Sequence, residues 1–161
     1  MSDTLTIRVA TPQDLAPLDA LYARAYPRLL KADYPPSVLV TALPLIARAQ
    51  PALLRTGTFH VAQAASGALV GAGGWTPRGG GIGDIRHVVT DDRQTRRGVG
   101  RAILERCLAQ ARAAGIRALD CKSTRTAVPF YAALGFVAQR AIEVELRPGI
   151  AFPAVQMLLE L

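Results

Sequence analysis

The sequence "TRRGVGRAILERCLAQARAAG", residues 95–115, joins a glycine-containing turn directly to a helical pattern. One face of that pattern carries apolar side chains at helical spacing, namely Leu104, Cys107, Leu108 and Ala111. Gly115 stands where a C-terminal cap belongs, while Gly98 and Gly100 let a ligand approach the backbone closely. The first N–H groups of a helix lack intrahelical partners and carry a partial positive charge. The stretch therefore predicts a turn and helix that hold a phosphate group.

Two familiar phosphate-binding loops do not match these letters. The P-loop ends in Gly-Lys-Ser or Gly-Lys-Thr, which the sequence GVGRAI of residues 98–103 lacks. The dinucleotide fingerprint requires a third glycine, and Ile103 occupies that position. The residues around the turn must therefore identify its ligand.

Length and composition indicate one domain spanning residues 1–161, because half of the residues are apolar and can bury a core. Cys107 and Cys121 lie in apolar patterns and, with only His60 and His87 as further ligands, predict neither a disulfide framework nor a metal site. The N-terminus lacks a targeting pattern, and no window approaches the roughly 18 to 20 apolar residues of a membrane span. We expect a reduced, cytoplasmic, metal-free protein without membrane insertion.

The net charge of +7 is concentrated in residues 93–125, which carry nine basic and two acidic residues, while the rest of the chain is balanced. A basic region at one turn and helix indicates an anionic partner there. Phosphate fits this charge, and nucleic acid has the same sign. The region lacks interleaved aromatic residues and a recognition-helix motif, so a nucleic-acid-binding domain is the weaker alternative.

Strands and helices alternate along the chain, which predicts an α/β domain. Residues 4–10 have the pattern of a strand. A helix follows from Pro12, with Thr11 as its N-cap, and should end before Pro27 because proline breaks helices.

The middle of the chain predicts a hairpin that leads into the glycine turn. Residues 26–54 are interrupted by prolines and favour one or two short helices. Ser66 and Gly67 predict a hairpin turn, and residues 81–90 predict the strand that precedes the opening stretch.

The residues around the glycine turn resemble the signature of the GNAT superfamily of acyl-CoA-dependent N-acyltransferases. The sequence VVTDDRQTRRGVGRAI, residues 88–103, holds the family's loop between a strand and a helix. The sequence TAVPFYAALGF, residues 126–136, matches the family's later helix with its Phe-Tyr and Leu-Gly-Phe turn. The resemblance spans nearly the whole chain. It implies an α+β fold with a mixed, mainly antiparallel sheet flanked by helices, in which acetyl-CoA lies between two splayed central strands.

The resemblance also implies which backbone groups bind coenzyme A. The loop residues whose N–H groups would grip the pyrophosphate are Arg96, Arg97, Gly98, Val99, Gly100 and Arg101. The residues whose amides would pair with the pantetheine arm are Val88, Val89 and Thr90. Thr95 and Asp92 depart from the usual residues, which matters little to a backbone grip. Thr124 stands where an asparagine often contacts the cofactor.

Acetyl transfer to an amine requires a base, because an alkylammonium is almost fully protonated at neutral pH. Asp84 is our candidate, since many family members carry a glutamate there and a bridging water can compensate for the shorter side chain. It lies six residues before Thr90, an even spacing that places both on one face of a strand. The alternative is that Asp84 only ends the glycine loop or pairs with Arg86. His87, expected on the opposite face, is the competing base.

Tyr131 is the candidate partner of the departing thiolate, because the family's tyrosine at this place reaches the thioester sulfur. Its hydroxyl would stabilise or protonate the thiolate, and the alternative is a core aromatic residue. The backbone N–H of Val88 or Val89 is the expected donor to the developing oxyanion.

The acceptor is expected to be the amine of a small molecule or peptide. The aromatic residues that could line its side are Tyr22, Tyr26, Tyr34 and Trp75. The acids that could attract a cationic acceptor are Asp19, Asp33, Glu143 and Glu145. A catalytically inactive acyl-CoA-binding domain remains an alternative. A homodimer could form through the apolar strand of residues 150–161.

Overall fold

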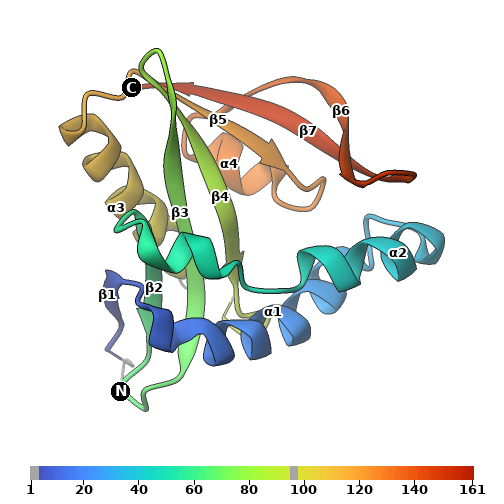
Figure 1. Ribbon diagram of the computed structural model, residues 1–161, viewed down its shortest axis with the longest axis horizontal. Coiled ribbons are helices and arrows are strands. Elements are labelled where there is room, and N and C mark those ends of the chain that lie inside the picture. The colour runs from blue at the N-terminus through green and yellow to red at the C-terminus, as the bar shows by residue number, and fades with distance from the viewer. Residues whose placement is uncertain (1–3, 95–97) are drawn as a thin grey trace.

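The centre of the fold is a seven-stranded sheet in the order β1-β2-β3-β4-β5-β7-β6, seen in a computed structural model that describes residues 4–94 and 98–161 (Figure 1). The strands are β1 (Thr6–Val9), β2 (Phe59–Gln63), β3 (Leu69–Gly79), β4 (Ile82–Thr90), β5 (Ala118–Ser123), β6 (Val137–Arg147) and β7 (Ile150–Glu160). Neighbouring strands in the described residues pair antiparallel except β4 and β5, which pair parallel. The expected mixed, mainly antiparallel sheet is confirmed.

Helices cover both faces of this sheet. They are η1 (Pro12–Asp14), α1 (Leu15–Leu30), α2 (Pro36–Ile46), η2 (Pro51–Arg55), α3 (Val99–Ala113) and α4 (Val128–Ala133). Side chains of α1, α2 and η2 share one apolar core with the sheet, and those of α3 and α4 share another. We call the two sides of the sheet the α1 face and the α3 face.

The first helix begins at the predicted cap. Thr11 precedes η1, and its backbone N–H donates to the Asp14 carboxylate at 2.8 Å. The same carboxylate accepts two hydrogen bonds from Arg8, at 2.8 and 2.9 Å. Because these bonds satisfy an N–H group at the helix start, they fix where the chain turns into α1.

The helix α1 does not end before Pro27, as the sequence predicted, but continues to Leu30. Proline removes the hydrogen bond to the carbonyl four residues earlier, at Ala23, and its ring crowds that carbonyl. Ala23 is exposed, so water can replace the lost donor. Tyr26 and Leu30 are buried on either side of the proline, and their packing holds the last turn in place.

The expectation that no apolar stretch is long enough to cross a membrane was wrong. Residues Pro36–Arg55 meet the length and hydropathy of a span, and 22% of the 18-residue window is buried. The fold divides this stretch, because α2 ends at Ile46 and the separate turn η2 begins at Pro51.

The β2–β3 hairpin turns at Ser66 and Gly67 as predicted, where the Gly67 N–H donates to the Ala64 carbonyl at 2.9 Å. Further along β3, Gly74 packs directly against the backbone of β2. A Cβ at Gly74 would lie 2.4 Å from the Thr58 carbonyl oxygen and 2.6 Å from the Phe59 Cα. Both neighbours are backbone atoms, so neither can move aside without disturbing the sheet.

We therefore expect Gly74→Ala to lower the free energy of unfolding by about 3 kcal/mol, the upper end for overpacking. Gly149→Ala is the control, because a Cβ at Gly149 meets nothing within 4 Å and only its φ of 82° is unfavourable. That control should cost about 1 kcal/mol. Urea unfolding of the three proteins measures both values, and equal losses would contradict the close contact.

The last strand, β7, lies in the interior of the sheet. β7 pairs with β5 through Val155–Glu160 and with β6 through residues 150–158. The sheet ends at β1 and at β6, so any pairing between copies through a sheet edge would involve β1 or β6 rather than residues 150–161.

Candidate active site

The strands β4 and β5 form a fork. They pair only where Ile82–Asp84 lies beside Ala118–Asp120, at the start of both strands. Beyond this point β4 and β5 no longer pair with each other, although β4 still pairs with β3 and β5 still pairs with β7. The two strands therefore diverge, as Figure 1 shows. The expected splay of two central strands is confirmed.

A cavity of about 810 Å³ lies beside this fork. Its lining comes from the end of β4, the start of α3, the helix α4, the segment between β5 and α4, and the last turns of α1. The residues predicted to bind the cofactor that line it are Val88, Val89, Thr90, Gly98, Val99, Gly100 and Arg101. Arg96 and Arg97 fall outside the described residues. The predicted residues that the structure describes therefore lie together at one cavity, which Thr124 also lines.

The helix α3 begins with its N-terminus at the cavity. Gly98 is the N-cap with φ 77°, a left-handed conformation that favours glycine. The first intrahelical bond runs from Ala102 N–H to the Gly98 carbonyl at 3.0 Å, so the preceding N–H groups have no intrahelical acceptor. At Gly100 an added Cβ would lie 2.9 Å from the Phe130 ring, so glycine allows α3 and α4 to approach closely here.

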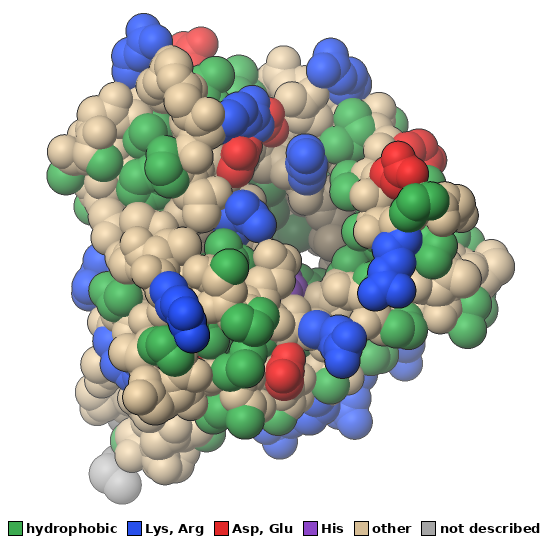
Figure 2. All heavy atoms as spheres, in the orientation of Figure 1, with side chains coloured by type: hydrophobic (Ala, Val, Ile, Leu, Met, Phe, Trp, Pro, Cys, Tyr) green, Lys and Arg blue, Asp and Glu red, His purple; other side chains and the backbone are tan. Residues whose placement is uncertain are grey.

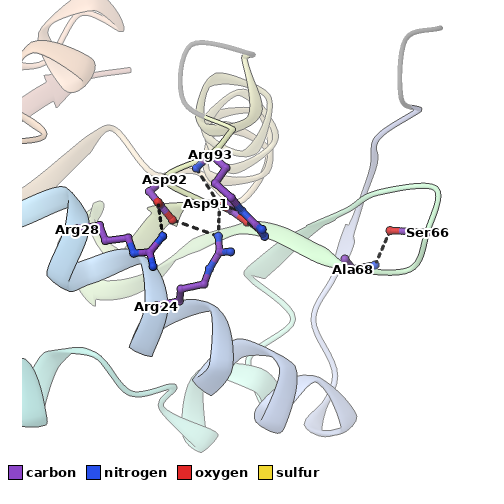
Figure 3. A network of polar contacts seen from close by, with 7 residues as sticks. All are labelled: Arg24, Arg28, Ser66, Ala68, Asp91, Asp92 and Arg93. Carbon is purple, nitrogen blue, oxygen red and sulfur yellow. Dashed lines mark hydrogen bonds and ion pairs between the residues drawn. The ribbon is translucent and has the colours of Figure 1, made fainter.

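An ion-pair network anchors the chain just before the glycine turn that precedes α3 (Figure 3). Asp91 and Asp92 follow β4 and pair with Arg24 and Arg28 of α1. Asp91 is buried and also accepts from the Arg93 backbone N–H at 2.9 Å. Burial alone would raise the pKa of Asp91, but the hydrogen bonds from Arg93 and the charge of Arg24 outweigh it and hold the pKa below its ordinary value. The network therefore ties α1 to the start of the turn.

Tyr131 is a buried cavity residue on α4, with 5% of its surface exposed. The rings of Phe130 and Phe136 pack edge-on against it at 5.1 and 5.3 Å between centroids. Burial, and then the neighbouring Cys121 thiol, raise the pKa of Tyr131 well above its ordinary value. Its hydroxyl therefore stays protonated and can act as a hydrogen-bond donor.

A bulge in β4 overturns the argument that placed Asp84 and Thr90 on one face. Arg86 pairs with Gly74 but Val89 pairs with Ala72, so β4 has an extra residue between these positions. His87 takes φ 53° within the bulge. Because the extra residue reverses the alternation, Asp84 lies on the α1 face and Thr90 on the α3 face, where its Oγ1 approaches Gly100.

Asp84 has an arginine partner, but it is Arg78 of β3 rather than Arg86. Arg78 donates to both carboxylate oxygens of Asp84 and, at 2.8 Å, to Asp120 Oδ2. Asp120 is buried on β5 directly opposite Asp84. Asp84 is not among the residues that line the cavity. Sequence reasoning missed Arg78 and Asp120, although a single acid within the apolar strand ALDCKS was an available signal.

His87 packs into the α1 face, not onto the face opposite Asp84 as the sequence predicted. Its ring lies 4.1 Å from the Tyr22 ring and 5.8 Å from the Tyr26 ring, measured between centroids. Nε2 lies 2.9 Å from the Ile46 carbonyl oxygen and must donate a proton to it. This hydrogen bond links β4 to the end of α2, so the ring nitrogen has a structural role.

We expect the stability of the protein to depend on the titration of His87. Burial lowers its pKa from 6.5 to about 4. Between these values the unfolded chain binds a proton that the folded protein does not, so stability falls as the pH is lowered through this window, by about 3 kcal/mol. His87→Asn, which tolerates the left-handed backbone, should lose this contribution. Urea unfolding from pH 7 to pH 4 measures the difference, and parallel curves for both proteins would contradict it.

The aromatic residues expected on the acceptor side do not stay together. Trp75 lies on the α3 face, where its Nε1 donates to Gln110 at 3.1 Å. Tyr22 is fully buried and donates to the His87 carbonyl, while Tyr26 lines the cavity. Tyr34 donates to a β7 carbonyl. Only part of the expected set therefore lies at the fork.

Comparison with known proteins identifies the family. A family model described as "Acetyltransferase (GNAT) domain" matches residues 42–160, most of the chain. The protein belongs to the GNAT acetyltransferases. No curated protein matches the sequence.

Solved GNAT structures share the fold. A GCN5-related N-acetyltransferase from Rhodopseudomonas palustris has a TM-score of 0.81 and 20% identity, covering 100% of this chain and 99% of its own. PaiA N-acetyltransferase from Thermoplasma acidophilum, solved with coenzyme A, has a TM-score of 0.77 and 15% identity over 98% and 99%. A Mycobacterium tuberculosis protein solved with CoA has a TM-score of 0.63 and 20% identity over 97% and 99%. This GNAT protein therefore has the complete fold of its relatives.

Proposed function

We propose that this protein is an acetyl-CoA-dependent N-acetyltransferase that acts on a primary amine of a small molecule or peptide. The observation that carries the proposal is the cavity beside the fork, where the N-terminus of α3 and the Tyr131 side chain meet the end of β4. Family membership supports acetyl transfer, and relatives solved with CoA support the co-substrate.

The cavity offers separate groups for separate parts of acetyl-CoA. The N–H groups at the start of α3 and the partial charge of the helix suit the pyrophosphate. From Val88 to Thr90, the edge of β4 that faces β5 does not pair with that strand. This edge suits the amide-bearing pantetheine arm, which can add to the sheet like a strand. Arg96 and Arg97 complete the proposed loop from outside the described residues.

The properties of the two cysteines favour direct attack by the amine in a ternary complex over a mechanism through an acyl-cysteine. Burial raises the pKa of Cys107 and of Cys121 to about 12, so neither thiol forms a reactive thiolate near neutral pH. Neither residue lines the cavity. We therefore propose no acyl-cysteine step. Buried reduced thiols also agree with the proposed cytoplasmic location.

Acetyl-CoA supplies the acetyl group as a thioester, and its thiol is the leaving group. The backbone N–H of Val88 or Val89 would stabilise the negative charge that develops on the carbonyl oxygen. The Tyr131 hydroxyl would donate a hydrogen bond to the departing sulfur, because its raised pKa keeps it protonated. Asp84 would accept the proton of the amine through water.

The place of Asp84 on the α1 face supports this last role. Its side chain is 32% exposed beside Arg78, so water can reach it. Lying off the cavity lining, it can serve an acceptor that enters from the face opposite α3.

Amine-dependent thiol release tests the proposal. The protein is incubated with acetyl-CoA and a panel of primary amines, and free thiol is followed with time. We expect release at least about tenfold above the amine-free rate for some amine, as catalysis by even one general base provides. Binding of acetyl-CoA without amine-dependent release would instead establish the acyl-CoA-binding alternative.

A further inference from the structure

A row of polar side chains crosses the α1 face at the fork. Asp84 and Asp120 are direct neighbours in the last paired positions of β4 and β5. Two carboxylates in this arrangement repel, and Arg78, which donates to both, offsets one of their two negative charges. Gln156 of β7 adds a hydrogen bond to Asp120 at 3.0 Å. Both oxygens of Asp84 and Oδ2 of Asp120 therefore accept hydrogen bonds, whereas Asp120 Oδ1 is buried without a partner among the described residues.

A second layer with the opposite charge lies where the strands separate. Arg86 follows Asp84 by two residues on β4, and Lys122 follows Asp120 by two residues on β5. Neither strand has a register shift over these residues, so both cations project from the α1 face. They therefore flank the opening of the fork from its two sides. Figure 2 shows the molecule hollowed near its centre, with charged side chains around the hollow.

Neither of these two cations has an acidic partner in the part of the chain that the structure describes. Arg86 is half-buried and donates only to neutral groups, to Thr76 Oγ1 at 3.2 Å and to Gln50 Oε1 at 3.3 Å. Within residues 4–94 and 98–161, neither Arg86 nor Lys122 takes part in an ion pair. A half-buried guanidinium with spare donors is suited to a carboxylate, which it can bind through two parallel hydrogen bonds.

The acids expected to attract a cationic acceptor are hydrogen-bonded within the protein or lie exposed on an outer strand. Asp19 accepts from the Ala49 backbone N–H at 2.7 Å, and Asp33 accepts from the Thr126 hydroxyl at 2.7 Å. Glu143 and Glu145 lie exposed on the outer strand β6. Arg86 and Lys122 outweigh the one negative charge that Arg78 leaves on Asp84 and Asp120, so the opening of the fork has a net positive charge. This charge disfavours an acceptor that carries only ammonium groups.

We propose that Arg86 and Lys122 bind a carboxylate of the acceptor, so that the substrate is an amino acid or a related small amine that carries a carboxylate. The inference rests on the proposed acetyl transfer at the same site. Arg86 precedes Val88 by two residues, across the bulge at His87. A carboxylate held by Arg86 leaves an α-amino group close to the bulge, where the amides of Val88 and Val89 face the reacting carbonyl in the proposed mechanism.

Product binding tests this inference separately from turnover. The protein is first saturated with CoA, and its binding is confirmed by calorimetry. A panel of N-acetyl amino acids and their C-terminal amides is then titrated, so that each pair differs only in the carboxylate. The same titrations are made with Arg86→Gln, Lys122→Gln and the control Arg112→Gln, which alters an exposed arginine on α3. Unfolding midpoints show that all variants are folded.

We expect at least one N-acetyl amino acid to bind tenfold or more tightly than its amide. Arg86→Gln should remove most of that preference, Lys122→Gln part of it and Arg112→Gln none, while affinity for CoA is unchanged. The inference is overturned if acid and amide bind alike, if neither binds, or if Arg86→Gln weakens both equally. Failure of CoA to bind the native protein would instead overturn the proposed function.

Discussion

Replacing Gly98 with glutamate should abolish the thermal stabilisation of this protein by acetyl-CoA. Gly98 lines the cavity, and a Cβ there meets nothing within 4 Å, so the new carboxylate projects into open space where the pyrophosphate is proposed to bind. A ligand at a hundred times its dissociation constant stabilises the native protein by about 2.7 kcal/mol. For a domain of this size, that corresponds to a rise in melting temperature of about 5 to 10 °C. The melting temperature of Gly98→Glu should not respond.

The structure offers a matched control at Gly57. Its φ is also 77°, a Cβ there also meets nothing within 4 Å, and it does not line the cavity. Gly57→Glu therefore carries the same charge and the same backbone cost, about 1 to 2 kcal/mol, without obstructing the ligand. It should keep the full shift with acetyl-CoA. If both variants respond like the native protein, the start of α3 does not hold the pyrophosphate. If the native protein itself does not respond, the proposed co-substrate is wrong.

Replacing Tyr131 with phenylalanine should lower kcat by about a hundredfold. The change removes one hydroxyl and leaves the ring, which packs between Phe130 and Phe136. Loss of a single donor to a developing charge has effects of about this size. Because acetyl-CoA is bound mainly by backbone groups in the proposed mode, its stabilising effect should be unchanged. Steady-state thiol release together with the thermal shift measures both quantities.

Tyr34→Phe is the matched control for this loss of a buried hydroxyl. Tyr34 donates to the Pro153 carbonyl at 2.7 Å and accepts from the Arg125 backbone N–H at 2.8 Å, but it does not line the cavity. Its replacement should lower stability by about 1 to 3 kcal/mol, because buried partners lose their hydrogen bonds. Its kcat should stay near the native value. An unchanged kcat in Tyr131→Phe would remove this tyrosine from the mechanism.

Local sequence was sufficient for the parts of the site that depend on one short segment. The glycine turn and helix of residues 98–115 require a left-handed backbone at Gly98, close packing of the backbone at Gly100 and a repeating apolar face. The residue types in the sequence indicate each of these features. The hairpin turn at Ser66 and Gly67 was predictable for the same reason. The family's motifs then placed Tyr131 and the end of β4 at one cavity.

Predictions that depended on counting along a strand or helix were less secure. The even spacing of Asp84 and Thr90 predicts one face only if the strand is regular, and the bulge at His87 reverses it. Pro27 breaks a helix only if nothing else holds the last turn, and buried neighbours hold it here. In both cases packing against distant segments decided the local conformation.

The sequence by itself determined that this is a GNAT domain with a glycine turn before α3, because those features need particular residues at fixed local spacing. Only the tertiary structure decided that Arg78, rather than Arg86, pairs with Asp84 and reaches Asp120. That choice follows from the register of β3, β4 and β5, which brings together residues up to 42 positions apart. Strand register is set by the packing of the whole sheet, so the charge left at the opening of the fork could not be read from neighbouring letters.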